Sequence, residues 1–209
     1  MSVSPFGDSA VLLELEQRVD PPIVALARAI ADAWEAAGHG PAVPAYASVL
    51  LHFDPLTLAP DAALERARSL AAGAAGPVPA TAGRLIELPT RYDGPDLADV
   101  AERSGLTVAE VIAAHAGREH VAYFNGFMPG FAYCGPLDPR LKAPRLAAPR
   151  TRVPAGSVAV AEGQTAVYPF DSPGGWRLIG RTDVVLFDPG AARPALILPG
   201  DRVRFVPVA

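Results

Sequence analysis

The most distinctive segment of the sequence begins Gly126-Phe127-Met128-Pro129-Gly130-Phe131-Ala132-Tyr133 and runs to Arg181. Glycine and proline recur through it, as in Ser172-Pro173-Gly174-Gly175-Trp176. These residues fix unusual backbone angles and leave peptide groups accessible, so they shape a surface rather than fill an interior. Each turn alone is compatible with an ordinary connection between barrel strands. Together with the aromatic and arginine side chains among them, they favour a binding cleft.

Length and composition limit the classes of protein to consider. The 209 residues allow one large domain or two small ones, and 50% are hydrophobic. A net charge of −4 gives no indication of binding to nucleic acid or to an anionic membrane. The single cysteine, Cys134, excludes an internal disulfide and fits a reducing compartment. No signal-peptide pattern and no apolar run of roughly 18 residues is found, so we expect a cytoplasmic protein.

Hydrophobic periodicity predicts a small α+β domain over residues 1–80. The expected elements are a strand over 11–15, a helix over 21–38, a strand over 46–53 and a helix over 60–73. One further strand is expected in the loops, which would give a layer of the split β-α-β kind. The Ala-, Gly- and Pro-rich stretch Ala72–Arg84 has no periodicity and predicts a linker to a second domain over 81–209.

The second domain is predicted to be mostly β. A strand over 85–89 and a helix from Leu97 come first, and Thr107-Val108-Ala109-Glu110 matches the capping box of another helix. The expected strands that follow cover 120–127, 157–161, 164–170, 175–181, 183–188, 195–198 and 202–206. A closed or nearly closed barrel would remove the exposed edges of so many short strands.

Two features of this domain suggest functional side chains. His115 lies on an apolar helix face near the helix C-terminus, so it is either a core histidine or a group that reaches the cleft floor. A long proline-rich loop is predicted over 128–156, and long ordered loops are usually functional. Arg145 and Arg150 each follow a proline there, and we expect them to be held in place as anion-binding groups. Nucleotide-binding loops, metal-site spacings and nucleophile motifs are absent, so the catalytic set is incomplete.

The sequence resembles the bacterial family variously called the B subunit of 5-oxoprolinase, allophanate hydrolase subunit 1 or KipI-type kinase inhibitor. The resemblance covers essentially the whole chain. It rests on Gly126-Phe127-x-Pro129-Gly130-Phe131-x-Tyr133, Pro144-Arg145-x-x-x-Pro149-Arg150-x-x-Val153-Pro154-Ala155-Gly156-Ser157-Val158, Ser172-Pro173-Gly174-Gly175-Trp176, Gly180-Arg181-Thr182 and Pro199-Gly200-Asp201.

This resemblance implies a ferredoxin-like N-terminal domain followed by a cyclophilin-like barrel. It also implies a companion cyclophilin-like subunit, similar to allophanate hydrolase subunit 2 or the C subunit of 5-oxoprolinase, and a third lactam-utilisation subunit. Together they would use ATP, with Mg²⁺ at the level of the complex, to open 5-oxoproline to glutamate. Two alternatives stay open: an inhibitor of a sensor histidine kinase, and a subunit of a biotin-dependent, urea-type carboxyltransferase.

The expected site combines residue chemistry with motif position. Arg145 and Arg150 would bind anionic groups, and fixed cations of this kind stabilise negative charge that develops in a reaction. The remaining candidates are Gln164 and Tyr168 to orient the substrate, Gly174 and Gly175 as backbone donors, Phe131 and Tyr133 as substrate contacts, and His115 for proton transfer. No metal ligands are expected in this chain. The sequence departs from the family pattern at His120, Asn125 and Cys134, which bears on the substrate.

Overall fold

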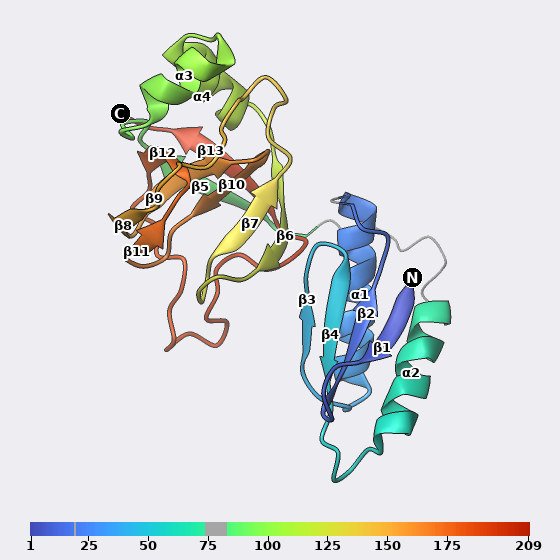
Figure 1. Cartoon of the computed structure of the whole chain (residues 1–209). Helices are drawn as coiled ribbons and strands as arrows, with labels where there is room; N and C mark the ends of the chain where they lie inside the picture. The colour runs from blue at the N-terminus through green and yellow to red at the C-terminus, as the bar shows by residue number, and fades with distance from the viewer. Residues whose placement is uncertain (19, 74–82) are drawn as a thin grey trace. The chain divides into compact units, whose positions relative to one another are not determined.

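The computed structural model describes residues 1–18, 20–73 and 83–209. The chain divides into two compact units, Met1–Thr81 and Ala82–Ala209 (Figure 1). Most of the predicted linker lies outside the described residues.

An antiparallel sheet and two helices make up the first unit. Within its described residues, the strands lie in the order β1-β2-β4-β3. Since β2 and β3 both run antiparallel to β4, which lies between them, β2, α1 and β3 form a split β-α-β arrangement. The elements are β1 (Ser2–Pro5), β2 (Ala10–Glu14), α1 (Pro21–Ala36), β3 (Ala42–Pro44), β4 (Ser48–His52) and α2 (Pro60–Gly73).

The core of the first unit follows the two periodicities of the sequence. Val11 and Leu13 of β2 are buried on one face of the strand. The buried stripe of α1 includes Ile23, Ala27, Ile30 and Trp34. Trp34 is fully buried, and its Nε1 donates to the carbonyl oxygen of His52 at 2.8 Å, so its polar edge is satisfied.

The sequence predicted β2, β4 and both helices of this unit. It left one strand unplaced, whereas the described residues contain two more, β1 and β3. Both are short and partly exposed, so they carry little alternation of hydrophobicity. The ferredoxin-like assignment stays a prediction.

A sheet that almost closes into a barrel dominates the second unit. Within the described residues it has seven strands in the order β12-β9-β10-β7-β6-β13-β5, and only β13 and β5 pair in parallel. A separate small sheet pairs β8 with β11, while α3 and α4 lie together at one end of the barrel (Figure 1). The cyclophilin-like assignment stays a prediction. The elements are β5 (Leu85–Thr90), α3 (Leu97–Ser104), α4 (Val108–Ala116), β6 (His120–Asn125), β7 (Ala132–Gly135), β8 (Arg150–Val153), β9 (Ser157–Ala161), β10 (Gln164–Val167), β11 (Ser172–Gly174), β12 (Arg177–Arg181) and β13 (Arg202–Pro207).

The segment after β5 brings the barrel close to closure by pairing with β12 at a single bridge. Arg91 and Arg181 exchange two backbone hydrogen bonds, of 2.9 and 2.8 Å. Further along, the backbone N–H of Asp96 donates to the carbonyl oxygen of Leu178 at 2.9 Å. A Cβ at Gly180 would collide with the carbonyl oxygen of Arg91, so glycine permits this close approach. The pairing satisfies an otherwise open sheet edge.

Strand β9 is buried on both faces and separates two packed clusters. Val158 and Val160 belong to the main core, which also takes residues from α3 and α4. Ala159 and Ala161 point to the opposite face, where their small side chains leave room for large ones. The aromatic residues packed in this second cluster include Phe131, Tyr168 and Trp176.

Two predictions for the second unit are wrong. The strands expected over 183–188 and 195–198 are absent from the described residues, where only an isolated bridge pairs Phe187 with Ala195. Prolines at 189, 194 and 199 remove backbone donors there, which limits a longer ladder. Conversely, the segment 128–156, predicted as one loop, contains β7 and β8. Their four-residue length hid them among glycines and prolines.

Alanine at Gly180 should destabilise the second unit, because its methyl group would collide with the Arg91 carbonyl oxygen at the closure. We expect urea denaturation to show a loss of about 2 kcal/mol in the free energy of unfolding. Gly190→Ala is the control, since a Cβ there would make only an ordinary contact, at 3.4 Å, with the Asp188 side chain. Equal stability of the two variants would contradict the role of Gly180.

Candidate functional site

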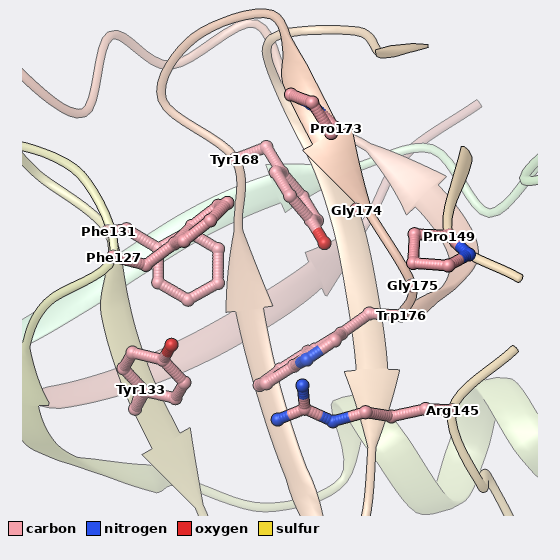
Figure 2. Close-up of a pocket in the computed structure, with 10 residues that line it drawn as sticks. All are labelled: Phe127, Phe131, Tyr133, Arg145, Pro149, Tyr168, Pro173, Gly174, Gly175 and Trp176. Atoms are coloured by element: carbon pink, nitrogen blue, oxygen red, sulfur yellow. The ribbon is translucent and has the colours of Figure 1, made fainter. Parts of the chain in front are cut away.

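An aromatic pocket lies over the cluster that packs on the alanine face of β9 (Figure 2). Its cavity volume is about 280 Å³, near the lower limit of small-molecule sites. Three segments that are separate in sequence meet there: 127–133, 145–149 and 168–176. The lining residues are Phe127, Phe131, Tyr133, Arg145, Pro149, Tyr168, Pro173, Gly174, Gly175 and Trp176.

The aromatic side chains of the pocket hold one another in edge-to-face contacts. The ring centroid of Phe131 lies 5.2 Å from that of Tyr168 and 5.8 Å from that of Trp176. Tyr133 lies 5.7 Å from Trp176. Such contacts are favourable and restrict the orientation of each ring. They form a fixed apolar wall, and Figure 2 shows the hydroxyls of both tyrosines directed toward the pocket.

Two glycines complete the wall beside Tyr168. A Cβ at Gly174 would collide with the Tyr168 hydroxyl, so only glycine lets β11 pass this close to the ring. A Cβ at Gly175 would meet nothing nearer than Pro149, at 3.9 Å, so that side of the residue faces open space. Both predicted glycines therefore line the pocket, and their role as backbone donors stays a prediction.

Arg145 is the cation among the described lining residues. Its Nε donates to the Glu162 carboxylate at 3.2 Å, and both side chains are more than half exposed, so a ligand can replace this partner at little cost. Burial raises the pKa of Tyr133 and of Tyr168, and the nearby Arg145 charge partly opposes that rise. Both phenols stay neutral at physiological pH and keep a proton to donate.

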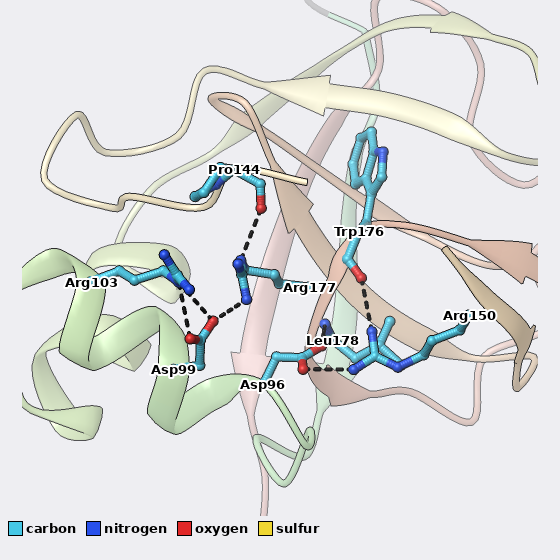
Figure 3. Close-up of polar contacts among 8 residues, drawn as sticks. All are labelled: Asp96, Asp99, Arg103, Pro144, Arg150, Trp176, Arg177 and Leu178. Atoms are coloured by element: carbon cyan, nitrogen blue, oxygen red, sulfur yellow. Dashed lines mark hydrogen bonds and ion pairs between the residues drawn. The ribbon is translucent and has the colours of Figure 1, made fainter. Parts of the chain in front are cut away.

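Arg150 lies outside the lining of this pocket, in an ion pair with Asp96 (Figure 3). Its guanidinium donates to Asp96 Oδ1 at 2.6 Å and to the Trp176 carbonyl oxygen at 3.4 Å. The second oxygen of Asp96 accepts from the Leu178 backbone N–H at 2.7 Å. The predicted anion-binding role of Arg150 stays a prediction. Its described contacts support the backbone of a pocket residue.

A second ion pair is formed by Asp99, which lies in the first turn of α3, three residues after Asp96. Arg177, with a side chain only 7% exposed, pairs with Asp99, and its Nε donates to the carbonyl oxygen of Pro144 at 2.9 Å (Figure 3). Hydrogen bonding from Arg103, together with the Arg177 charge, lowers the pKa of Asp99. Because Pro144 directly precedes Arg145, this contact fixes the start of the segment that carries the pocket's cation.

His115 is fully buried in the core, outside the pocket lining. Its Nδ1 lies 2.7 Å from the Tyr92 hydroxyl, and its Nε2 lies 2.8 Å from Thr165 Oγ1. Thr165 donates its own proton to the Ala159 carbonyl oxygen at 3.1 Å, so Nε2 must be the protonated ring nitrogen. Burial holds the pKa of His115 well below its usual range. Its proton-transfer role stays a prediction.

The remaining sequence candidates also lie outside the lining. Gln164 begins β10, opposite Ala161 of β9. His120 and Cys134 are buried, and burial raises the pKa of the Cys134 thiol to about 12, so it is a poor nucleophile. Asn125 donates from Nδ2 to a backbone carbonyl oxygen at 2.9 Å. The structure thus brings together six of the nine predicted site residues: Phe131, Tyr133, Arg145, Tyr168, Gly174 and Gly175.

Sequence reasoning missed four lining residues: Phe127, Pro149, Pro173 and Trp176. Each belongs to one of the quoted motif strings, next to or close to a residue that was selected. Their shared signal was an apolar side chain on a Gly- and Pro-rich turn, which also describes ordinary turn residues.

The described ranges contain no candidate metal site and no candidate membrane-spanning helix. No group of three or more His, Cys, Asp or Glu side chains is placed to hold a metal ion in those ranges. Nor does any helix within them have the length and apolar character that crossing a bilayer requires.

Comparison with known families and proteins gives consistent matches. A family model described as "Carboxyltransferase domain, subdomain C and D" matches residues 1–197. The B subunit of 5-oxoprolinase from Escherichia coli O157:H7 is 49% identical over 127 residues, which are 59% of this chain and 58% of that protein. Its namesake in Bacillus subtilis is 43% identical over 129 residues, which are 60% of this chain and 54% of that protein. Each match spans less than two-thirds of the relative.

Solved structures share the fold. TTHA0988 superposes with a TM-score of 0.85 at 39% identity, over 96% of this chain and 40% of that one. The conserved uncharacterized protein PH0987 from Pyrococcus horikoshii gives 0.59 at 40% identity, over 99% of this chain and 97% of that one. The urea amidolyase of K. lactis gives 0.76 at 20% identity, over 99% of this chain and 15% of that one, a likeness of fold alone.

Replacing Arg150 by alanine should destabilise the second unit, because the mostly buried Asp96 side chain would lose its cationic partner. We expect a loss on the order of 2 kcal/mol in the free energy of unfolding, measured by urea denaturation. Arg152→Ala is the matched control, since Arg152 and its partner Asp171 form an exposed ion pair. Equal losses in both variants would show that the Asp96 pair contributes no more to stability than the control pair does.

Stability should fall as the pH drops below about 6.5. Burial lowers the pKa of His115 and of His120 in the folded state, so the unfolded chain binds more protons in that range. Each histidine that stays neutral in the folded state should lower the free energy of unfolding by up to about 1.4 kcal/mol for each pH unit. Urea denaturation at pH 7.5 and pH 5.5 measures the difference. His115→Gln should reduce the pH dependence, and an unchanged dependence in this variant would contradict the assignment.

Proposed function

The chain belongs to the family described as carboxyltransferase domain, subdomain C and D, and from this premise we propose that it is a subunit of an ATP-dependent hydrolase complex of the 5-oxoprolinase type. The relatives named as the B subunit of 5-oxoprolinase support the proposal. The complex would open the ring of 5-oxoproline, a small lactam with one carboxylate, to give glutamate. The observation that carries the proposal is the pocket, which pairs an aromatic wall with a single exposed guanidinium.

Each part of 5-oxoproline has a complementary group in the lining. The lactam ring packs against the wall formed by Phe131, Tyr133 and Trp176. Its carboxylate replaces Glu162 as the partner of Arg145, in a charge-assisted hydrogen bond. The phenols of Tyr133 and Tyr168 are neutral donors suited to a lactam carbonyl oxygen, where negative charge grows as the amide is attacked.

The role of this chain is to bind and orient the lactam. The described lining offers phenols and a guanidinium but no thiol, imidazole or carboxylate to attack the amide or to move a proton. A companion similar to the C subunit of 5-oxoprolinase, with a third lactam-utilisation subunit, would supply those groups at a shared site. In TTHA0988 the part similar to this chain is only 40% of the protein, so there the same fold is joined to further sequence.

The lining of this pocket does not fit a bound ATP–Mg²⁺. The pocket lining supplies one cation for a triphosphate and no carboxylate for a metal ion. Elsewhere in the described ranges, no group of three or more His, Cys, Asp or Glu side chains is placed to hold a metal ion. We therefore propose that ATP binds outside this pocket, and no step of the proposed role depends on it here.

A carboxyltransferase acting on an amide is the second candidate, and the family description favours it. The same pocket would hold the amide that accepts or donates the carboxyl group. The two candidates differ in their requirement for a biotinylated carrier. Turnover of a lactam without such a carrier supports the hydrolase, whereas turnover that requires it supports the carboxyltransferase.

Replacing Arg145 by glutamine should impair turnover of 5-oxoproline by the complex assembled with its companion subunits. The variant loses the cation that pairs with the substrate carboxylate, so we expect kcat/KM to fall by about 10- to 100-fold. The measurement is 5-oxoproline-dependent ATP hydrolysis by the purified complex.

Arg152→Gln is the matched control for this experiment. Arg152 is also exposed and paired with one carboxylate, that of Asp171, but it does not line the pocket. We expect wild-type turnover from this variant. A correctly assembled complex that shows no 5-oxoproline-dependent turnover would exclude the proposed activity, and equal losses in both variants would exclude a specific role for Arg145.

A further inference from the structure

Phe127 has a backbone conformation that residues with side chains rarely adopt. Its φ is +67°, and the Met128 N–H donates to the Gly126 carbonyl oxygen at 2.7 Å. This is the pattern of the rare, strained γ-turn with positive φ at its centre. Among the described residues, the other non-glycine with positive φ is Glu162, which with Gly163 forms the two-residue turn of the β9–β10 hairpin, where positive φ is normal.

Burial does not offset the strain at Phe127. The residue is 61% exposed, although its ring meets Phe131 and Tyr168 edge-on, at centroid distances of 5.4 and 6.4 Å. It lines the pocket on the side of Phe131, whereas Gly175 and Pro149 lie on the other side (Figure 2). The turn thus places a large apolar ring at the mouth of the pocket, where it is accessible to a bound molecule.

We propose that Phe127 is a ligand-contacting residue that gives the pocket its specificity for a ring. Its side chain would pack on the flat ring of a small cyclic amide while Arg145 holds the carboxylate of that molecule. The inference rests on the proposed function. It adds Phe127 as the residue that lets the pocket discriminate between a lactam and an open-chain amide. Backbone strain kept in an exposed residue is expected where a ligand, rather than the core, makes use of the side chain.

The first test separates the strain from the loss of the ring. Phe127→Gly and Phe127→Ala both remove the ring, but only glycine adopts a φ of +67° without steric cost. We expect the glycine variant to melt about 2–4 °C above the alanine variant. The melting temperature of the wild type should lie within a few degrees of those of the two variants. A wild type far more stable than both would show that the ring belongs to the core and would overturn the inference.

The second test compares a ring with an open chain. The two probes are 5-oxoproline and glutaramate, which keeps an amide and a carboxylate but lacks the ring. Titration calorimetry on the assembled complex gives the affinities. We expect Phe127→Ala to weaken binding of 5-oxoproline by about tenfold and that of glutaramate by less than twofold.

Phe170→Ala is the control, because Phe170 is also an exposed aromatic residue (43%) but lies outside the lining. Its affinity for both probes should equal that of wild type. The inference would be overturned if Phe127→Ala weakened binding of the two probes equally. It would also be overturned if the variant kept its affinity but no longer co-purified with the companion subunits, which would assign Phe127 to assembly. If the wild-type complex turns over 5-oxoproline, the proposed function stands under either of these results. If the wild-type complex neither binds nor turns over the lactam, both the proposed function and the role of Phe127 are excluded.

Discussion

The site of the second unit depends on the hydrogen bonds that the Asp96 carboxylate accepts. One of its oxygens accepts from Arg150 at 2.6 Å and the other from the backbone of Leu178 at 2.7 Å. Asp96 precedes α3, Arg150 begins β8 and Leu178 lies in β12, so one mostly buried group joins a helix, the small sheet and the barrel. Charge-assisted hydrogen bonds of this length are among the stronger polar contacts in proteins. Arg150 also donates to the carbonyl oxygen of Trp176, a residue whose ring forms part of the pocket wall.

The pair formed by Asp99 and Arg177 extends this support to the next segment. Arg177 donates to the carbonyl oxygen of Pro144, the residue before Arg145. The arginines that support the pocket thus have internal partners, whereas the arginine within it has only an exposed and weak one. Such a division of roles would let the pocket keep its shape when a ligand replaces Glu162 at Arg145, as proposed. A site built in this way loses little conformational freedom on binding.

The alternation of valine and alanine in β9 explains how one barrel strand serves two clusters. Valines fill the main core, and alanines leave a shallow face that large rings occupy. Those rings form an apolar wall with phenol hydroxyls at its surface, which suits recognition of a small flat molecule better than chemistry on it. A pocket that binds without a nucleophile is consistent with a site completed by another subunit. That completion is part of the proposal.

The sequence by itself determined the helices, part of the strands and most of the pocket lining. Periodicity gave both helices of the first unit, and the capping box at Thr107 and Glu110 begins α4 as expected. The motif strings located six lining residues because Gly- and Pro-rich turns with aromatic residues are recognisable without long-range information. Only the tertiary structure decided that Arg150 supports the pocket from outside and that His115 is a core residue. Their partners lie 54 residues away at Asp96 and 50 residues away at Thr165, and hydrophobic periodicity carries no record of which distant polar groups will meet.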